Sequence, residues 1–154
     1  LRYFNVFGPR QDPNGPYAAI IPLLLRGIHT GKPVTIFGDG EQTRDFTYVD
    51  NVVDANILAA EGPASVSGHV VNIGTGSRLS LLELVGIVEE VSGSALQVKH
   101  APERAGDVRD SQADLARARS ILGYEPRVSV RDGVEQLWEW SQANPAALEP
   151  AGKA

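Results

Sequence analysis

The chain has 154 residues, of which 42% are hydrophobic and 21% are charged, and its formal net charge is -5 at pH 7. This length and composition are those of a single globular domain with a hydrophobic core, and they argue against a disordered chain. The net negative charge argues against a nucleic-acid-binding protein, while the absence of cysteine excludes disulfide bonds, a thiol nucleophile and a cysteine-ligated metal site.

The first part of the chain predicts a strand, a loop, a helix and a second strand. Residues 2–7 are aromatic and β-branched enough for a buried strand, and the dense run of turn-forming residues over 8–16 predicts a loop. In the apolar segment that follows, Pro22 fits the first turn of a helix and Gly31 fits its end. The β-branched run over 34–37 then predicts a short strand.

The most informative motif of the chain is a glycine turn followed by an arginine and a strand. A Gly-Asp-Gly turn at 38–40 leads to Arg44 and then to a short strand over 46–49. Asp50 is the expected N-cap of a helix over 51–61, because its carboxylate can accept hydrogen bonds from free backbone N–H groups. This order places one permanent cation on a rigid hairpin, where it can face an anionic ligand.

The second half of the chain predicts two strands and three capped helices. The strands are expected over 70–74 and 96–100, from their apolar and β-branched composition. Each helix begins at a Ser or Asp that can cap it, and the predicted helices are those over 80–91, 114–123 and 129–143. Strands that alternate with helices predict an α/β fold, and the apolar runs 2–7 and 70–73 fit a parallel sheet covered on both faces.

Several motifs for chemistry on a nucleotide are absent from the sequence. Gly38-x-Gly40 and Gly74-x-Gly76 each lack the third glycine of a dinucleotide-binding fingerprint, and there is no Gly-Lys-Ser/Thr phosphate loop. None of the tyrosines is followed four residues later by a lysine, so no Tyr-x-x-x-Lys pair shares a helix face. The histidines have no metal-like spacing, so no metal site is predicted.

Arg44 has two interpretations. It can be a ligand of a diphosphate, since a guanidinium binds phosphate in a bidentate geometry. It can also be half of a surface ion pair with Glu41 or Asp45, which contributes about 0–1 kcal/mol. Both interpretations are open on the sequence alone.

Three further residues are candidates for the same site. Arg104 lies in a Pro/Gly loop over 102–109, an unusual place for a packing role. Asp107 can accept hydrogen bonds from a pair of ribose hydroxyls, or it can pair with Arg104 or Arg109. Asn5 lies at the carboxyl end of a predicted strand, where open α/β sheets place ligand contacts, although an asparagine there can also bond to loop backbone.

The sequence shows no secretory signal pattern and no apolar run near the roughly 18 residues that span a bilayer, so we expect a cytoplasmic protein without a membrane segment. It starts at Leu1 and contains no methionine, and a predicted strand begins at once. We therefore expect the chain to be the downstream part of a longer protein, with a trimmed free-standing domain as the alternative.

Five segments of the sequence resemble the C-terminal half of the extended short-chain dehydrogenases/reductases. They occur in the family's order: LRYFNVFGPRQ at 1–11, Tyr17 to Pro22, Gly38 to Asp50, Val71-Asn72-Ile73-Gly74, and Arg104 to Asp107. The likeness is nearest to the NAD-dependent nucleotide-sugar epimerases and dehydratases, above all the UDP-hexose 4-epimerases, and it covers residues 1–143. Residues 144–154 are expected to form a frayed tail.

The resemblance implies a Rossmann-like fold, of which this chain holds the last parallel strands and a small substrate-binding α/β subdomain. In the family, the N-terminal half carries the glycine fingerprint and the catalytic Ser/Thr and Tyr-x-x-x-Lys residues. The chain would then be the nucleotide-sugar-binding portion of the enzyme, with no catalytic residue of its own and no turnover in isolation. NAD would be bound mainly by the other half, and the complete protein is expected to be a homodimer.

The resemblance also implies roles for individual residues. Those beside the nicotinamide of the cofactor are Tyr3 and Phe4. Those at the nucleotide are Ala19 and Ile20 at its border and Thr35 and Phe37 beside the base. In the rest of the site, the diphosphate would be contacted by Asn5, Arg44 and Arg104. Asp107 would hold the ribose, and Asn72 would lie at the edge of the pocket.

The implied reaction is the 4-epimerisation of a UDP-sugar, by oxidation at sugar C4 with tightly held NAD, rotation of the 4-keto intermediate and hydride return to its other face. A dTDP-glucose 4,6-dehydratase or a UDP-glucuronate decarboxylase on the same scaffold is the alternative within the enzymes. A non-catalytic nucleotide-binding or protein-interaction module is the alternative of another class, and it would fold alone and bind UDP.

Overall fold

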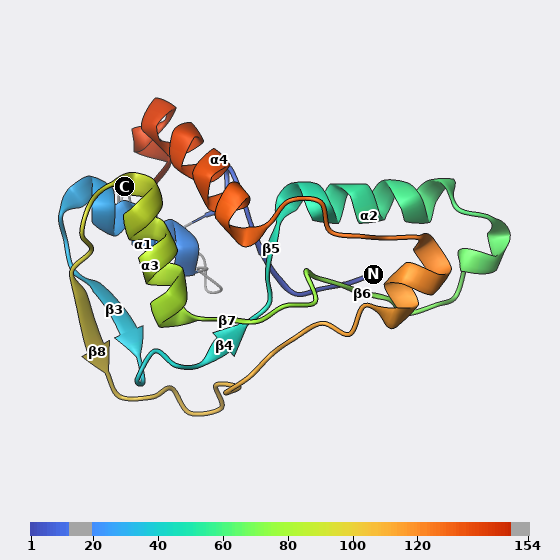
Figure 1. The fold of residues 1–154 in the computed structure, drawn as a ribbon, viewed down its shortest axis with the longest axis horizontal. Helices are drawn as coiled ribbons and strands as arrows, with labels where there is room; N and C mark the ends of the chain where they lie inside the picture. Colours follow the sequence, from blue (N-terminus) through green and yellow to red (C-terminus); the bar gives the residue numbers. More distant parts are fainter. Residues whose placement is uncertain (13–19, 149–154) are drawn as a thin grey trace, which may run out of the picture.

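The computed structural model describes residues 1–12 and 20–148, which form an α/β fold built from short strand pairs (Figure 1). Among these residues the parallel pairs are β1 (Arg2–Tyr3) with β6 (Asn72–Ile73), β2 (Asn5–Phe7) with β5 (Phe46–Tyr48), and β3 (Val34–Phe37) with β8 (Val98–Ala101). The pair of β4 (Thr43–Arg44) with β7 (Leu79–Ser80) is antiparallel. Each pair joins segments that are distant in the sequence, and the predicted α/β class with parallel strands is confirmed.

The predicted N-terminal strand is two strands, because the chain changes partner after Phe4. The Phe4 backbone N–H donates to Ile73 O at 3.0 Å, whereas the next N–H, that of Asn5, donates to Asp45 O at 3.1 Å. Within this segment only Phe7 is buried, so the expected coverage of the strand on both faces is not found among the described residues.

Helices pack around the strand pairs. The α-helices in the described part of the chain are α1 (Ile20–Thr30), α2 (Val49–Glu61), α3 (Leu81–Ser92) and α4 (Val130–Ala143). Shorter helical turns are the 3₁₀-helix η1 (Ala64–Val66), the π-helical η2 (Ala118–Leu122) and the 3₁₀-helix η3 (Pro145–Leu148). None of the helices within 1–12 and 20–148 has the length and apolar character that a membrane span requires.

The predicted helix caps at Ser80 and Ser129 are confirmed by their hydrogen bonds, whereas η2 has its N-cap at Arg117 without a side-chain cap, and Asp114 bonds only to the backbone two residues on. Ser80 and Glu83 form the expected capping box at the start of α3. The Ser129 hydroxyl accepts from an N–H in the first turn of α4 at 3.1 Å, and the Asp114 carboxylate accepts from the Ala116 N–H at 2.9 Å. Each serine cap occupies a backbone donor that the helix itself leaves free.

The predicted cap at Asp50 is wrong. Helix α2 begins at Val49, its N-cap position is Tyr48, and no side chain caps it. The strand β5 therefore runs directly into the helix, and Asp50 lies inside the first turn. Its negative charge is still favourable there, because the N-terminal end of a helix carries a partial positive charge.

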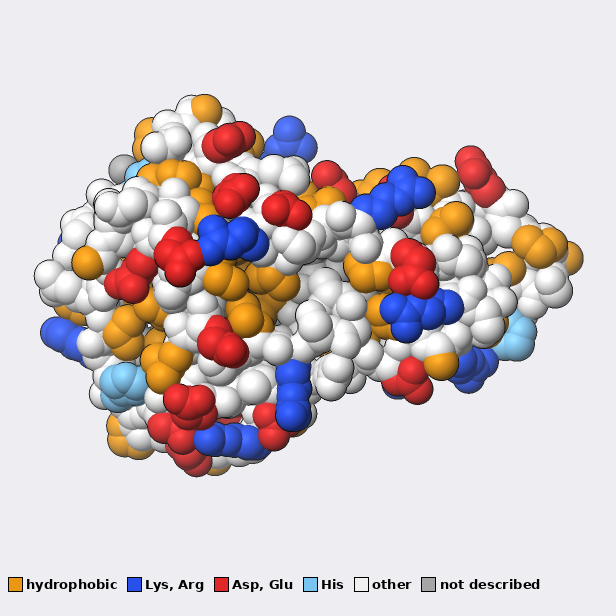
Figure 2. All heavy atoms as spheres, viewed as in Figure 1, with side chains coloured by type: hydrophobic (Ala, Val, Ile, Leu, Met, Phe, Trp, Pro, Cys, Tyr) orange, Lys and Arg blue, Asp and Glu red, His pale blue; other side chains and the backbone are white. Residues whose placement is uncertain are grey.

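Two hydrophobic clusters divide the described residues into a larger and a smaller lobe (Figures 1 and 2). The larger cluster lies among α1, α3, α4 and the strands β2, β3 and β5, around Phe7, Leu24, Ile36 and Leu84. The smaller cluster lies among α2, β6 and η2, around the fully buried Tyr124. Strand β4, which carries Arg44, lies between these two cores. The predicted hairpin is wrong, because β4 pairs with the distant β7 and not with a neighbouring strand of the chain.

The chain does not fray at residue 144. Leu148 of η3 is only 4% exposed and packs in the larger cluster, and η3 contacts α1 and α4. The expected frayed tail over 144–154 is therefore wrong as far as Leu148, because an apolar side chain there completes the core. Residues 149–154 lie outside the described residues.

A long segment over 102–113, called the crossing segment below, runs from β8 past β4 (Figure 1). Backbone hydrogen bonds join the two, since the Thr43 N–H donates to Arg109 O at 2.9 Å and the Ser111 N–H donates to Thr43 O at 3.1 Å. The Thr43 hydroxyl also donates to the Asp110 carboxylate at 2.6 Å. The crossing segment is thus tied to the strand that carries the predicted diphosphate-binding arginine.

Candidate functional site

A cleft of about 510 Å³ lies where β2, the end of β3, the start of α1, β4 and the crossing segment meet. The sequence-predicted residues that line it are Asn5, Ile20, Thr35, Phe37, Arg44, Arg104 and Asp107. These residues are spread over more than a hundred positions of the chain, and the fold brings them to one cavity. The cleft is therefore the candidate site.

Arg44 is held in this cleft by the backbone around it. Its side chain is only 14% exposed, and Nη1 donates to Thr43 O at 2.7 Å and to Arg109 O at 3.4 Å. Nη2 forms an ion pair with the Asp107 carboxylate. The two surface partners considered from the sequence, Glu41 and Asp45, are not the partners of Arg44. The guanidinium is fixed in place instead of moving freely at the surface.

Arg104 reaches the same cleft from the crossing segment. Its guanidinium carbon lies 3.9 Å from the centroid of the Phe37 ring, a cation–π contact that orients the plane of the guanidinium. The predicted convergence of Arg44 and Arg104 on one cavity is found. Two guanidinium groups in one cleft are suited to a ligand with two linked anionic groups.

Asp107 lies opposite Arg44 on a tight turn. The Asp107 N–H donates to Arg104 O at 3.1 Å, and Gly106 between them has a φ of 82°. Its carboxylate pairs with Arg44, whereas the alternative partner Arg109 pairs with Asp39 at 2.9 Å. The turn therefore presents Arg104 and Asp107 to the cleft together.

Two glutamines of the cleft were not among the predicted residues. Gln42 is 7% exposed, and its Nε2 donates to Phe37 O at 2.6 Å. Gln11 donates in the same way to Val6 O at 3.0 Å. In both side chains the buried Oε1 has no hydrogen-bond partner within the described residues. The sequence held a signal for Gln42, because it is two residues from Arg44 and strand alternation sends both side chains to one face.

Asp45 is the other functional candidate that sequence reasoning missed. The carboxylate is fully buried, and it accepts hydrogen bonds from the Thr75 N–H and hydroxyl, the Gly76 N–H and the Ala113 N–H. These contacts tie the segment that follows β4 to the Gly-Thr-Gly turn at 74–76 and to the end of the crossing segment.

Some predicted site residues lie elsewhere. Asn72 does not line the cleft, and its side chain donates to Asp114 O at 3.4 Å. Tyr3 is 46% exposed and its hydroxyl donates to Asn56 Oδ1 at 3.0 Å, while Phe4 packs against the smaller hydrophobic cluster. Neither Tyr3 nor Phe4 lines the cleft. The predicted residue Ala19 lies outside the described residues.

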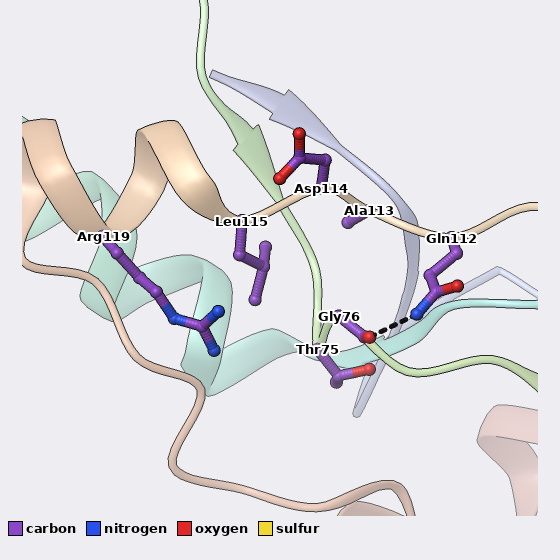
Figure 3. Close-up of a pocket in the computed structure, with 7 residues that line it drawn as sticks. All are labelled: Thr75, Gly76, Gln112, Ala113, Asp114, Leu115 and Arg119. Carbon is purple, nitrogen blue, oxygen red and sulfur yellow. Dashed lines mark hydrogen bonds between the residues drawn. The ribbon is translucent and has the colours of Figure 1, made fainter.

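A second cavity, of about 400 Å³, lies beside the smaller lobe (Figure 3). Its wall consists of the Gly-Thr-Gly turn and the segment 112–115, joined by a hydrogen bond from Gln112 Nε2 to Gly76 O at 2.6 Å. The one guanidinium drawn there, that of Arg119, is bound to the Glu125 carboxylate. This cavity contains none of the predicted site residues.

The charged side chains of the cleft are suited to binding rather than to proton transfer. Acidic and basic side chains are interspersed over the face shown in Figure 2, so an anionic ligand meets placed arginines and not a broad positive field. Among the described residues no group of three or more His, Asp or Glu side chains could hold a metal ion. The lining side chains are amides, a hydroxyl, apolar groups, two guanidiniums and a carboxylate that pairs with one of them.

The tyrosine with the most perturbed pKa lies away from the cleft. Burial raises the pKa of Tyr124 to about 12, and its hydroxyl donates to Gly74 O at 2.9 Å. It therefore acts as a buried hydrogen-bond donor behind the Gly-Thr-Gly turn.

Known proteins are similar to this chain in sequence. The chain matches the model of the NAD-dependent epimerase/dehydratase family over residues 1–74. It is 40% identical over 136 residues to a UDP-glucose 4-epimerase of Mycolicibacterium smegmatis, covering 88% of this chain and 42% of that protein. It is 32% identical over 146 residues to a UDP-N-acetyl-alpha-D-glucosaminuronate decarboxylase of Bacillus cytotoxicus, covering 91% of this chain and 44% of that protein. The chain thus spans less than half the length of these relatives.

Known proteins also share the fold. A UDP-glucose 4-epimerase of Thermotoga maritima, solved with UDP-glucose, matches with a TM-score of 0.86 and 40% identity, over 94% of this chain and 45% of that one. A UDP-glucuronic acid 4-epimerase of Bacillus cereus, solved with UDP-glucuronic acid and NAD, matches with a TM-score of 0.84 and 35% identity, over 92% and 44%. The Rossmann-like α/β class of these structures is therefore that of this chain.

Proposed function

This chain belongs to the NAD-dependent epimerase/dehydratase family, and we propose that its cleft is the nucleotide-sugar-binding site of a UDP-sugar 4-epimerase. The observation that carries the proposal is the placement of Arg44 and Arg104 in one cavity, although 59 residues separate them in the sequence. A pyrophosphate has the two adjacent anionic groups that such a pair of guanidiniums binds.

We assign each residue of the cleft to the part of the nucleotide sugar that it is proposed to contact. Arg44 and Arg104 bind the pyrophosphate, and the backbone bonds of Arg44 hold its guanidinium ready for this contact. Phe37 and Thr35 lie beside the base, which can stack on the aromatic ring next to Arg104. The pyrophosphate competes with the Asp107 carboxylate for Arg44, so Asp107 is available to accept from the ribose hydroxyls.

The remaining predicted contacts lie at the borders of the site. Asn5 is the first residue of β2 and not the carboxyl end of a strand, as was predicted, and we propose that it contributes an amide to the sugar diphosphate. Ile20 and Ala19 are proposed to border the nucleotide. Asn72 is proposed only at the edge, since its side chain lies outside the cleft.

The residues of this chain do not by themselves form a dinucleotide cradle. The glycine fingerprint is missing from the sequence, and Tyr3 and Phe4 contact the smaller lobe instead of the cleft. We propose that NAD is bound mainly by residues outside 1–154, with Tyr3 and Phe4 beside it. The Tyr-x-x-x-Lys pair is also absent, so we expect no turnover by these residues alone.

A decarboxylase is a second candidate function. It is favoured by the similarity to the Bacillus cytotoxicus decarboxylase over 91% of this chain. Both reactions use a UDP-sugar, and the cleft residues named above are proposed to contact the nucleotide diphosphate. Incubating the complete protein with UDP-glucose and with UDP-glucuronate, and identifying the products by NMR, separates the two chemistries.

The binding proposal is tested by titrating UDP into the complete protein and its Arg44→Ala variant. Loss of the charge-assisted phosphate contact is expected to cost about 1.5–3 kcal/mol, roughly 10- to 100-fold in Kd. Arg78→Ala is the matched control, because Arg78 is half-exposed, lies outside the cleft and pairs only distantly with Asp110, at 3.8 Å. Equal UDP affinity in the Arg44→Ala variant and the unmodified protein would overturn the proposal.

A further inference from the structure

Asp45 is a buried carboxylate that has no cation as a partner within residues 1–12 and 20–148. Its Oδ1 accepts from the Thr75 N–H at 2.8 Å and from the Thr75 hydroxyl at 2.7 Å. Its Oδ2 accepts from the Gly76 N–H at 2.9 Å and from the Ala113 N–H at 3.1 Å. A buried charge is costly unless hydrogen bonds replace its hydration, and here both oxygens are fully used.

The groups that the Asp45 carboxylate binds lie outside the cleft wall, and one of them belongs to a segment that reaches it. Ala113 is the end of the crossing segment, which carries Arg104 and Asp107. The other end of that segment is held at β8, where the Gly38 N–H donates to Ala101 O at 2.8 Å. Asp45 therefore holds the far end of this segment, in addition to the hydrogen bonds by which Thr43 holds Arg109, Asp110 and Ser111.

Asp45 also holds two further cleft residues through its backbone. Arg44 precedes it in the chain, and strand alternation sends the Arg44 side chain into the cleft while that of Asp45 turns away. The Asp45 carbonyl accepts from the Asn5 N–H at 3.1 Å. One residue thus links the strand of Arg44, the start of β2 and the crossing segment.

The packing around the carboxylate is too close for a side chain at the adjacent glycine. A Cβ added to Gly74 would lie 2.8 Å from Asp45 Oδ2 and 2.6 Å from Ala113 Cβ. The three segments therefore meet at a spacing that only a glycine at this position allows.

We infer that Asp45 is a positioning residue of the nucleotide-sugar cleft, which together with the Thr43 bonds sets the distance between Arg44 on β4 and Arg104 on the crossing segment. The inference rests on the proposed function, because that function makes the two guanidiniums act on one pyrophosphate. Asp45 touches no ligand in this role and acts only through the residues that it holds.

The Asp45→Asn substitution removes the negative charge and one acceptor oxygen but keeps the shape of the side chain. An amide has one acceptor oxygen, so its NH₂ group faces either the two donors of Thr75 or the N–H groups of Gly76 and Ala113. When the NH₂ group faces Gly76 and Ala113, both of their N–H bonds are lost and the crossing segment is released or shifted. When it faces Thr75, the Thr75 N–H loses its acceptor, whereas the Thr75 hydroxyl can turn to accept from the amide.

The test measures the Kd for UDP and the thermal midpoint of the complete protein and four variants. Asp45→Asn is expected to weaken UDP binding by about 10-fold, and Thr75→Val, which removes one of the hydrogen bonds to the carboxylate, by about 3-fold. Asn51→Ala is the matched control, because buried Asn51 makes three hydrogen bonds to residues 127 and 128 away from the cleft. It is expected to lower the thermal midpoint and leave the Kd within about 2-fold. Arg44→Ala is the fourth variant.

The outcomes are distinct. If Asp45→Asn binds UDP like the unmodified protein while Arg44→Ala does not, the positioning inference is overturned and the proposed function stands. If Asn51→Ala loses as much affinity as Asp45→Asn at an equal thermal midpoint, Asp45 has only a structural role. If Arg44→Ala keeps its affinity, the proposed function itself fails. Should Asp45→Asn not fold, Thr75→Val decides, since unchanged affinity in that variant contradicts the inference.

Discussion

Arg44 and Asp45 are adjacent in the chain, yet the Arg44 guanidinium pairs with Asp107 and the Asp45 carboxylate binds the backbone of Thr75, Gly76 and Ala113. Alternation along the extended backbone sends the two side chains to opposite sides. The Arg44 side chain therefore lines the cleft, while the Asp45 carboxylate joins this segment to the turn at 74–76 and to the crossing segment. A surface ion pair between the two, which the sequence left open, is not formed.

The turn that carries Arg104 and Asp107 depends on the positive φ of Gly106. This is tested by replacing Gly106 with alanine and comparing it with the same change at a helical glycine. Gly106 has a φ of 82°, and a Cβ added there would meet no atom within 4 Å. Gly106→Ala should therefore destabilise the protein by backbone strain alone, by about 1–2 kcal/mol. UDP affinity should fall as well, because the strained turn moves both cleft residues.

The control for this variant is Gly86→Ala. Gly86 lies inside α3 and its added Cβ also meets nothing within 4 Å, but its φ is helical. Alanine there should stabilise the protein by about 0.5–1 kcal/mol and leave UDP affinity unchanged. Urea denaturation of the two variants measures both effects, and a shift of the same sign in each would contradict the role of φ at Gly106.

Features set by short-range interactions could be predicted from the sequence. The capping box of Ser80 and Glu83 spans three residues, and the Ser129 cap and the turn after Thr30 are equally local. Such contacts need no knowledge of the tertiary fold. The Asp50 cap was predicted wrongly by the same reasoning, because tertiary structure runs β5 directly into α2 and leaves no free N-cap position for an aspartate.

The candidate site could be predicted only in part. Arg44 and Arg104 were identified by residue type and by resemblance, but the partner of Arg44 is 63 positions away and no local pattern points to it. The buried role of Asp45 also depends on two distant segments. Leu148 shows the same limit. A single apolar residue near the end of the chain does not indicate that its side chain packs in the hydrophobic core.

Arg104→Lys should weaken UDP binding even though the charge is kept. Lysine lacks the planar group that lies 3.9 Å above the Phe37 ring and that can bind two phosphate oxygens at once. We expect a loss of about 1–2 kcal/mol, measured by calorimetric titration of UDP into the complete protein. Arg117→Lys is the control, because Arg117 is exposed and contacts His69 outside the cleft. An Arg104→Lys variant that binds like the control would show that charge alone suffices.

The ion pair of Asp39 with Arg109 should make stability depend on acid pH. The hydrogen bond from Arg109, together with the backbone N–H of Glu41, lowers the pKa of Asp39 below its usual value of 3.8. The unfolded chain therefore binds a proton more readily than the folded chain, so this contribution to stability is present above the usual pKa and is lost as the pH falls through the lowered one. Asp39→Asn removes it at every pH.

The difference in thermal midpoint between the unmodified protein and Asp39→Asn should consequently be constant from pH 7 to about pH 5 and should shrink below about pH 4. Because the pair is exposed, high salt should reduce the difference at neutral pH as well. Scanning calorimetry at several pH values and two salt concentrations provides the measurement. A difference that stays the same down to pH 2.5 would mean that the Asp39 carboxylate contributes through its shape and not through its charge.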